Sequence, residues 1–184
     1  MQGRGIIAGM PLRDAMPQHY RLDPVHTRIA FQVSHAGFSN PIGSFARASG
    51  TLDFDPEDWS TTRVVVEVPV ATLDLGDADW QGKILDRTFF DAKRYPTARF
   101  VSTRVERGDG NHARLTGDLT LHGVTKPVTV SLEFTGEGKD MKGNPLVGFE
   151  GTFTLSRKEF GITEMAGMLG DDVRLMVSLE AAKK

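Results

Sequence analysis

The chain of 184 residues contains no cysteine. This absence excludes a disulfide framework, thiolate metal ligands and a cysteine nucleophile. It leaves the redox compartment open, because a chain without thiols is stable in oxidising and reducing surroundings alike. The sequence also lacks a G-x-S-x-G nucleophile motif and a glycine-rich phosphate loop between a strand and a helix. We therefore expect no catalytic residue and no covalent cofactor.

Long apolar runs are missing as well. No run approaches the roughly 20 residues of a membrane-spanning helix, so no transmembrane segment is expected. The only aliphatic run near the start, Ile6–Ala8, is shorter than the apolar region of about 7–15 residues in a signal peptide. Either a signal has been removed and replaced, or the protein is cytoplasmic. We interpret residues 1–18 as a tail that is disordered or foreign to the natural chain, and residues 19–184 as one domain.

Charge of one sign is not concentrated anywhere. The formal net charge is −2 with both signs interspersed, whereas a nucleic-acid-binding protein would need a basic stripe, so no nucleic-acid partner is expected. The five histidines form no H-x-x-x-H or H-x-H pair. Because a metal site needs ligands that converge on one point, this spacing predicts no metal site.

What the sequence has in abundance is a hydrophobic period of two, which is typical of half-buried strands. Turn-forming residues such as Gly108–Asn111 separate the alternating segments. The pattern predicts an all-β meander whose strands either stack as a sandwich or close as a barrel; periodicity alone does not separate the two. The eight alternating segments are Ile29–Val33, Thr51–Asp55, Val64–Val70, Phe100–Thr103, Leu115–Leu121, Val128–Phe134, Phe149–Leu155 and Val173–Leu179.

Two stretches break the alternation. Ser34–Ser44 is expected to contain a short helical turn, and Asp77–Asp91 a short helix with Trp80 and Ile84 on one face. Pro69 removes a ladder donor, so its strand is expected to end, bulge or lie at an edge there.

The aromatic residues allow two interpretations. They are either an ordinary core, as aromatics dominate most cores, or the lining of a deep apolar pocket capped by the two irregular stretches. Several of them lie in or beside those stretches, including Phe38, Phe45, Phe89 and Phe90.

Several phrases then coincide in order and spacing with one family, of which Thr116–Val128 (TGDLTLHGVTKPV) is the most specific. Over residues 19–182 the chain resembles the YceI-like family of lipid- and polyisoprenoid-binding proteins. The other phrases are Tyr20–Thr27, Phe31–His35, Gly43–Phe45, Gly50–Asp55, Phe89–Asp91, Tyr95–Thr103, Ser156–Ile162 and Gly170–Val173.

The resemblance implies an eight-stranded antiparallel lipocalin-like β-barrel, with one short helix and a helical turn capping the lumen. It implies an elongated interior that holds an isoprenoid lipid or a quinone such as ubiquinone, a periplasmic location with the cytoplasm as the alternative, and a homodimer. Many members carry an Arg-Asp-x-His-Leu phrase on the helix. The matching positions here are Trp80–Ile84, which lack its charged part and so predict a more apolar cap.

We therefore expect a carrier without bond chemistry. A polar headgroup at the barrel mouth would be within reach of His35, Asn40, Lys83 or Arg157. Two alternatives stay open: an enzyme that uses His35 or His26 as general base on a hydrophobic substrate, and a packed barrel that binds a partner. The expected ligand-binding residues are Phe31, His35, Phe38, Phe45, Trp80, Ile84, Phe89, Phe90, Phe100, Phe153, Arg157 and Phe160.

Overall fold

The computed structural model describes residues 16–183 of the chain. Most of the predicted tail, residues 1–15, lies outside the described residues, and its last residue, Gln18, already begins the first strand. The strands are β1 (Gln18–Leu22), β2 (Arg28–His35), β3 (Ile42–Phe45), β4 (Ser49–Phe54), β5 (Arg63–Pro69), β6 (Thr97–Arg107), β7 (His112–Leu121), β8 (Val124–Lys139), β9 (Pro145–Ser156) and β10 (Leu169–Ala182). One helix, α1 (Ala78–Leu85), and three 3₁₀ turns, η1 (Trp59–Thr61), η2 (Val70–Thr72) and η3 (Lys158–Phe160), complete the described elements.

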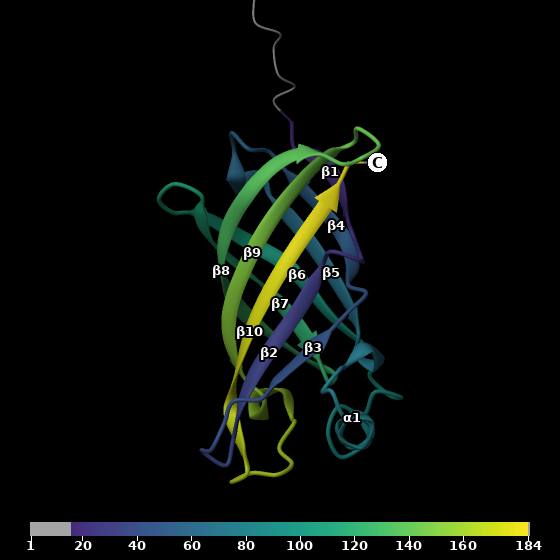
Figure 1. Cartoon of the computed structure of the whole chain (residues 1–184). Helices are drawn as coiled ribbons and strands as arrows, with labels where there is room; N and C mark the ends of the chain where they lie inside the picture. Colours follow the sequence, from purple (N-terminus) through teal and green to yellow (C-terminus); the bar gives the residue numbers. More distant parts are fainter. Residues whose placement is uncertain (1–15, 184) are drawn as a thin grey trace, which may run out of the picture.

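All of these strands belong to one antiparallel sheet that closes on itself (Figure 1). Two of the eight strands of the barrel are each made of two separate segments: β1 and β2 together form one, and β4 and β3 together form the next. β1 and β2 both pair with β10, at its end and along its earlier part, and β4 and β3 pair with β1 and β2 in turn. The ten strand segments therefore make the eight-stranded closed barrel that was predicted. Closing the sheet removes the exposed strand edges.

The alternation in the sequence follows the two faces of this wall. Along β9, for example, Phe149, Gly151 and Leu155 are buried, whereas Glu150, Thr152 and Thr154 are exposed. β5 ends at Pro69, as predicted, because proline has no N–H for the next ladder bond, and η2 follows at once.

One end of the barrel is packed solid. Four rings form the aromatic plug there, namely Phe54, Trp59, Phe134 and Phe149, with neighbouring centroids 5.1–5.9 Å apart. Aliphatic residues of β1, β4, β5, β7, β8 and β9 pack around them. The C-terminus lies at this end in Figure 1.

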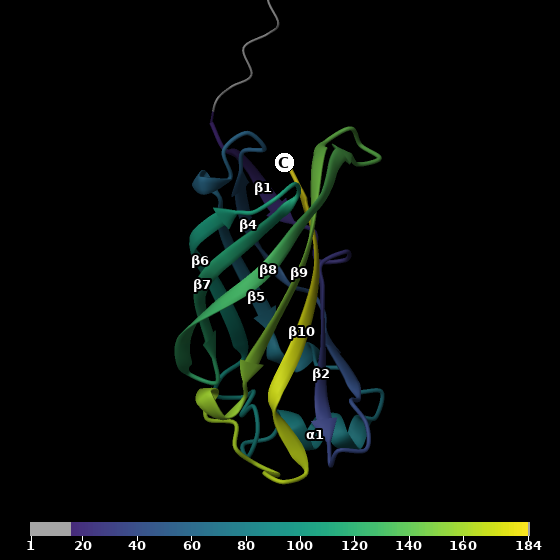
Figure 2. The ribbon, with the colours of Figure 1, turned by 90° about the vertical axis from the view of Figure 1, so that its left-hand side faces the viewer.

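The opposite end carries α1 and the loop between β9 and β10, as both Figure 1 and Figure 2 show. The predicted helix is confirmed: Asp77 caps it by accepting a hydrogen bond from the N–H of Trp80 at 2.9 Å. Within the described residues, no helix has the length and apolar character needed to span a bilayer.

The helical turn expected in Ser34–Ser44 is wrong. A tight β-turn stands there, closed by a hydrogen bond from the N–H of Phe38 to the carbonyl of His35 at 2.9 Å. Ala36 and Gly37 have φ values of 50° and 74°, and a right-handed helical turn would need negative values at both. The last three residues of the segment, 42–44, belong to β3.

Candidate functional site

An elongated cavity of about 700 Å³ occupies the part of the barrel between the aromatic plug and α1. On β10 its lining begins at Leu169 and reaches Leu179. Ten residues of strand span about 33 Å at ~3.3 Å per residue, or about 25 Å along the barrel axis if the strands tilt by ~40°. The cavity is therefore long, and its volume falls in the range of small-molecule sites, roughly 300–1,000 Å³.

Most of the predicted site residues line this cavity. Some of them belong to the irregular stretch Asp77–Asp91 and the others to strands or their ends. This combination agrees with the predicted pocket, in which an irregular stretch caps the barrel. The predicted residues in the lining are Phe31, His35, Phe45, Trp80, Ile84, Phe89, Phe90, Phe100, Phe153 and Arg157.

Two predicted residues lie elsewhere. Phe38 is 89% exposed, because the tight turn at Ala36–Gly37 directs it away from the barrel. Phe160 is only 1% exposed but lies in η3 outside the cavity lining, where its carbonyl is 3.0 Å from Nδ1 of His122. Of the suggested headgroup contacts, Asn40 and Lys83 do not line the cavity either.

The aliphatic side chains of the barrel wall were not among the predicted site residues. Val, Leu and Ile side chains from β2, β5, β7, β8, β9 and β10 complete much of the lining. The period-two rows contained the signal for them, since one face of each row had to point inwards. Representative members are Val66, Leu119, Leu132, Leu175 and Val177.

Glycine makes room for rings in this wall. A Cβ on Gly43 would lie 2.2 Å from the ring of Phe31 and 2.9 Å from Leu75. A larger residue there would force the ring of Phe31 or the side chain of Leu75 to shift. The width of the cavity near the mouth therefore depends on the missing side chain of Gly43.

Arg157 is the most constrained polar residue of the lining. It is 5% exposed and donates hydrogen bonds to the carbonyls of Gly170, Ile162, Glu164 and Leu169, at 2.8, 2.9, 2.8 and 3.1 Å. No carboxylate of the described residues forms a salt bridge with it. Guanidinium has five N–H donors, so one donor on Nη2 is left after these four bonds.

His35 lies beside the start of β10, close to the carbonyl partners of Arg157. In the β2–β10 register it stands opposite Leu169, whose carbonyl accepts from Arg157. The first residues of β10 therefore position both side chains: Leu169 pairs with His35 across the strands, and the carbonyls of Leu169 and Gly170 accept hydrogen bonds from Arg157. This arrangement offers hydrogen-bond donors at the open end of an otherwise apolar cavity.

Among the described lining residues, His35, Arg99 and Arg157 are the ionisable ones, and no carboxylate joins them. Nε of Arg99 lies 3.2 Å from a carboxylate oxygen of Glu67, in an exposed pair. General acid–base catalysis on a bound substrate would require a base, with a second group that orients it, within hydrogen-bond reach. The described lining residues bring no carboxylate to His35, and His26 lies outside the cavity.

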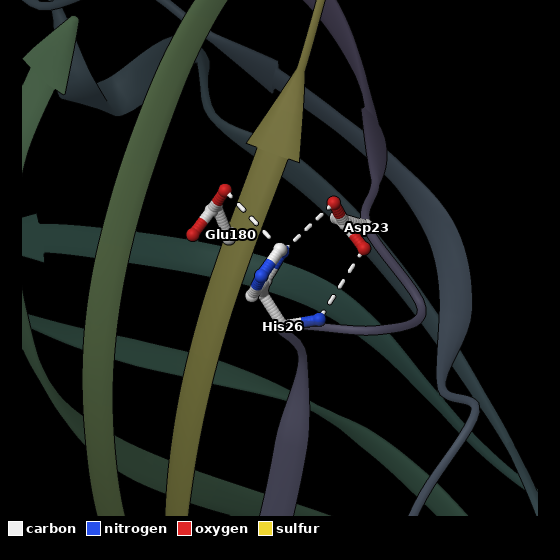
Figure 3. A group of neighbouring side chains, drawn as sticks. All are labelled: Asp23, His26 and Glu180. Atoms are coloured by element: carbon white, nitrogen blue, oxygen red, sulfur yellow. Dashed lines mark hydrogen bonds and ion pairs between the residues drawn. The ribbon is translucent and has the colours of Figure 1, made fainter. Parts of the chain in front are cut away.

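A second cluster, Asp23, His26 and Glu180, lies on the outside of the barrel where β1 gives way to β2 (Figure 3). Nδ1 of His26 is 3.0 Å from Oδ2 of Asp23 and 3.7 Å from Oε1 of Glu180. These ligand atoms lie within 4.8 Å of one another, so they have the types and spacing that could hold a metal ion. Sequence spacing could not reveal this group, because Glu180 reaches it only through the pairing of β10.

Charge also couples these three residues. The hydrogen bond to Asp23 and the charges of Glu180 and Asp23 raise the pKa of His26 above its ordinary value. For Asp23, burial acts to raise the pKa, but hydrogen bonds from His26 and from the N–H groups of Val25 and His26 outweigh it and lower the pKa. The cluster therefore favours a charged pair that ties the β1–β2 loop to β10.

The fold and the blind apolar cavity define the class: a closed antiparallel barrel with an interior compartment open at one end. The sequence family agrees with this class. The model of the YceI-like domain matches residues 20–181, and the chain belongs to that family.

Known relatives and structures show the same kinship. The chain is 36% identical to a UPF0312 protein of Ectopseudomonas mendocina, over 99% of this chain and 94% of that protein, and 33% identical to UPF0312 protein plu2095 of Photorhabdus laumondii, over 98% and 96%. BcnA of Burkholderia cenocepacia superposes with a TM-score of 0.79 at 25% identity, over 86% of this chain and 98% of BcnA. A polyisoprenoid-binding domain from Saccharophagus degradans has a TM-score of 0.68 at 13% identity, over 90% and 98%, and shares the fold.

Proposed function

We propose that this protein binds a long-chain isoprenoid lipid, either a polyprenyl compound or an isoprenoid quinone such as ubiquinone, and carries or sequesters it without bond chemistry. The observation that carries the proposal is the shape of the cavity. It is long, apolar along its walls, closed by the aromatic plug at one end and equipped with donors at the other.

The energetics suit a carrier. Burial of a CH₂ group stabilises by about 0.8 kcal/mol, so a chain of several tens of carbons is nearly insoluble by itself. A simple sum would exceed the practical limit of about −18 to −21 kcal/mol for noncovalent binding, so ordering of the chain must offset much of it. Apolar walls of sufficient length thus supply affinity without specific contacts.

The donors fix the direction of the ligand. A quinone carbonyl or a polyprenyl headgroup oxygen would accept from the remaining Nη2 donor of Arg157 or from His35 at the mouth. The hydrocarbon tail would then extend toward Phe149 at the closed end. The solved polyisoprenoid-binding domain of the same fold makes isoprenoids the first class of ligand to test.

The two alternatives from the sequence find less support. A packed barrel would leave no lumen, whereas this one encloses about 700 Å³. An enzyme would need a paired base within the cavity, and the described lining residues bring no carboxylate to His35.

The test is to purify the protein gently, extract it with organic solvent and identify the retained molecules by mass spectrometry. The proposal predicts a polyprenyl or quinone mass in an amount close to one per chain. Extracts from several hosts that contain no isoprenoid, together with no uptake of added quinone or polyprenol, would contradict it.

The periplasmic location and the homodimer stay predictions. Fractionation of cells that make the protein naturally tests the first, and light scattering of the purified chain tests the second.

A further inference from the structure

We infer that the aromatic plug limits the length of the hydrocarbon chain that the barrel accepts, and that Phe149 is the residue that sets this limit. The inference rests on the proposed function, because it concerns the tail end of the same cavity, and it adds a specificity-determining residue that the sequence did not indicate.

Phe149 is the one member of the plug that also lines the cavity. Its ring meets Phe54 edge-on at 5.1 Å and Phe134 at 5.2 Å between centroids. Phe54, Trp59 and Phe134 lie behind it, outside the cavity lining. A chain that enters from the mouth therefore meets the ring of Phe149 last.

The rings behind Phe149 are held in place. Phe54 and Trp59 are 1% and 4% exposed. The indole N–H of Trp59 donates to the carbonyl of Pro56 at 3.0 Å, and the guanidinium of Arg107 lies 4.6 Å from the centroid of the indole ring. A close-packed interior of this kind resists displacement by a chain end. The plug thus closes the cavity firmly, whereas the mouth is bordered by exposed residues of α1.

The surroundings of Phe149 suit the end of a hydrocarbon chain. Leu52, Leu115 and Val130 belong both to the core around the plug and to the cavity lining. A tail whose length matches the distance from the mouth to Phe149 is fully buried. Each unit beyond that length must stay in water at the mouth, so affinity should rise with chain length up to a limit and then stop rising.

The experiment offers the ligand-stripped protein two mixed ladders, one of all-trans polyprenols and one of n-alkanols, and reads the bound chain lengths by native mass spectrometry. Phe149→Ala and the milder Phe149→Leu shorten the plug, and Leu115→Phe adds a ring beside it. Thr152→Ala is the matched control, because Thr152 lies on the same strand as Phe149 and its side chain is exposed on the outer face of the barrel. Circular dichroism checks that each variant is folded.

The ring of phenylalanine holds about as many carbon atoms as one isoprene unit. We expect the chain length at which polyprenol affinity stops rising to be about one unit longer in Phe149→Ala, to increase by less in Phe149→Leu and to decrease in Leu115→Phe, while Thr152→Ala keeps the wild-type limit.

An unchanged limit in both Phe149 variants, or an equal shift in Thr152→Ala, would overturn the inference and leave the proposed function standing. A shifted limit seen only with n-alkanols, with no polyprenol bound, would support the role of Phe149 and contradict the isoprenoid ligand. Failure of both ladders to bind would overturn both.

Discussion

Phe149 packs edge-on against Phe54, with ring centroids 5.1 Å apart, and this contact marks the border between two halves of the barrel. On the side of Phe54 the lumen is filled by side chains. On the other side the lumen is open for most of its length. One half therefore stabilises the fold and the other half is left free to bind.

This division predicts unequal costs for the loss of a ring. In delipidated protein, Phe54→Ala should lower the free energy of unfolding by about 3–5 kcal/mol, the usual cost of a phenylalanine deleted from a packed core. Phe153→Ala should cost less than about 2 kcal/mol, because Phe153 is only partly buried and lines the open cavity, so its loss leaves a smaller new void in packed surroundings. Urea denaturation measures both, and equal costs would contradict the division.

Arg157 is predicted to stabilise the loop between β9 and β10, which supplies two of its four carbonyl partners, Ile162 and Glu164. Arg157→Met would leave four backbone carbonyls without their donor, so we expect the free energy of unfolding to fall by about 2–4 kcal/mol, with faster amide hydrogen exchange in residues 162–169. Arg157→Lys should recover only part of this loss, because an ammonium group has three donors and no planar fork. Full stability in Arg157→Met would show that the carbonyls do not depend on the guanidinium.

The cluster of Asp23, His26 and Glu180 predicts a pH dependence. The pKa of His26 is raised in the folded state, so its contribution to stability is fully present below the pKa of the unfolded histidine, about 6.5. That contribution is lost as the pH rises through the higher folded value. The melting temperature of the wild type should exceed that of His26→Gln by more at pH 5.5 than at pH 8.5. A difference that is constant over this range would contradict the raised pKa.

Sequence patterns located the strands because side-chain alternation is a local property of each strand. The alternating row Phe149–Leu155, for example, lies wholly within β9, and the row Val64–Val70 lies within β5 except for Val70, which begins η2. β1 and β3 were not found, since each is short, and β3 contains Gly43 and Ser44 in place of an apolar row. The tight turn after β2 was mistaken for a helical one because the left-handed backbone of Ala36 is not encoded in an apolar pattern.

The site was harder to derive than the fold. Sequence could not show that Phe149 lines the cavity while Phe54 fills the barrel, since both stand in alternating rows and their roles depend on register with other strands. For the same reason Phe160 was wrongly predicted to line the cavity, whereas it is buried outside the lumen. Arg157 was suggested as a headgroup contact, but its four carbonyl partners come from a loop whose shape no periodicity predicts.

The central claim is that the lumen itself holds a long apolar chain, and blocking the lumen tests it most directly. Val177 lines the cavity and stands opposite Gly151 in the β9–β10 register, whereas the neighbouring Thr152 points outwards. The measurement is native mass spectrometry of ligand-stripped wild type, Val177→Trp and Thr152→Trp after incubation with a long-chain polyprenol or isoprenoid quinone.

We predict a one-to-one complex for wild type and for Thr152→Trp, and at least about a tenfold loss of affinity for Val177→Trp, because the indole occupies space that the chain needs. Equal binding by all three proteins would place the lipid outside the barrel and contradict the account.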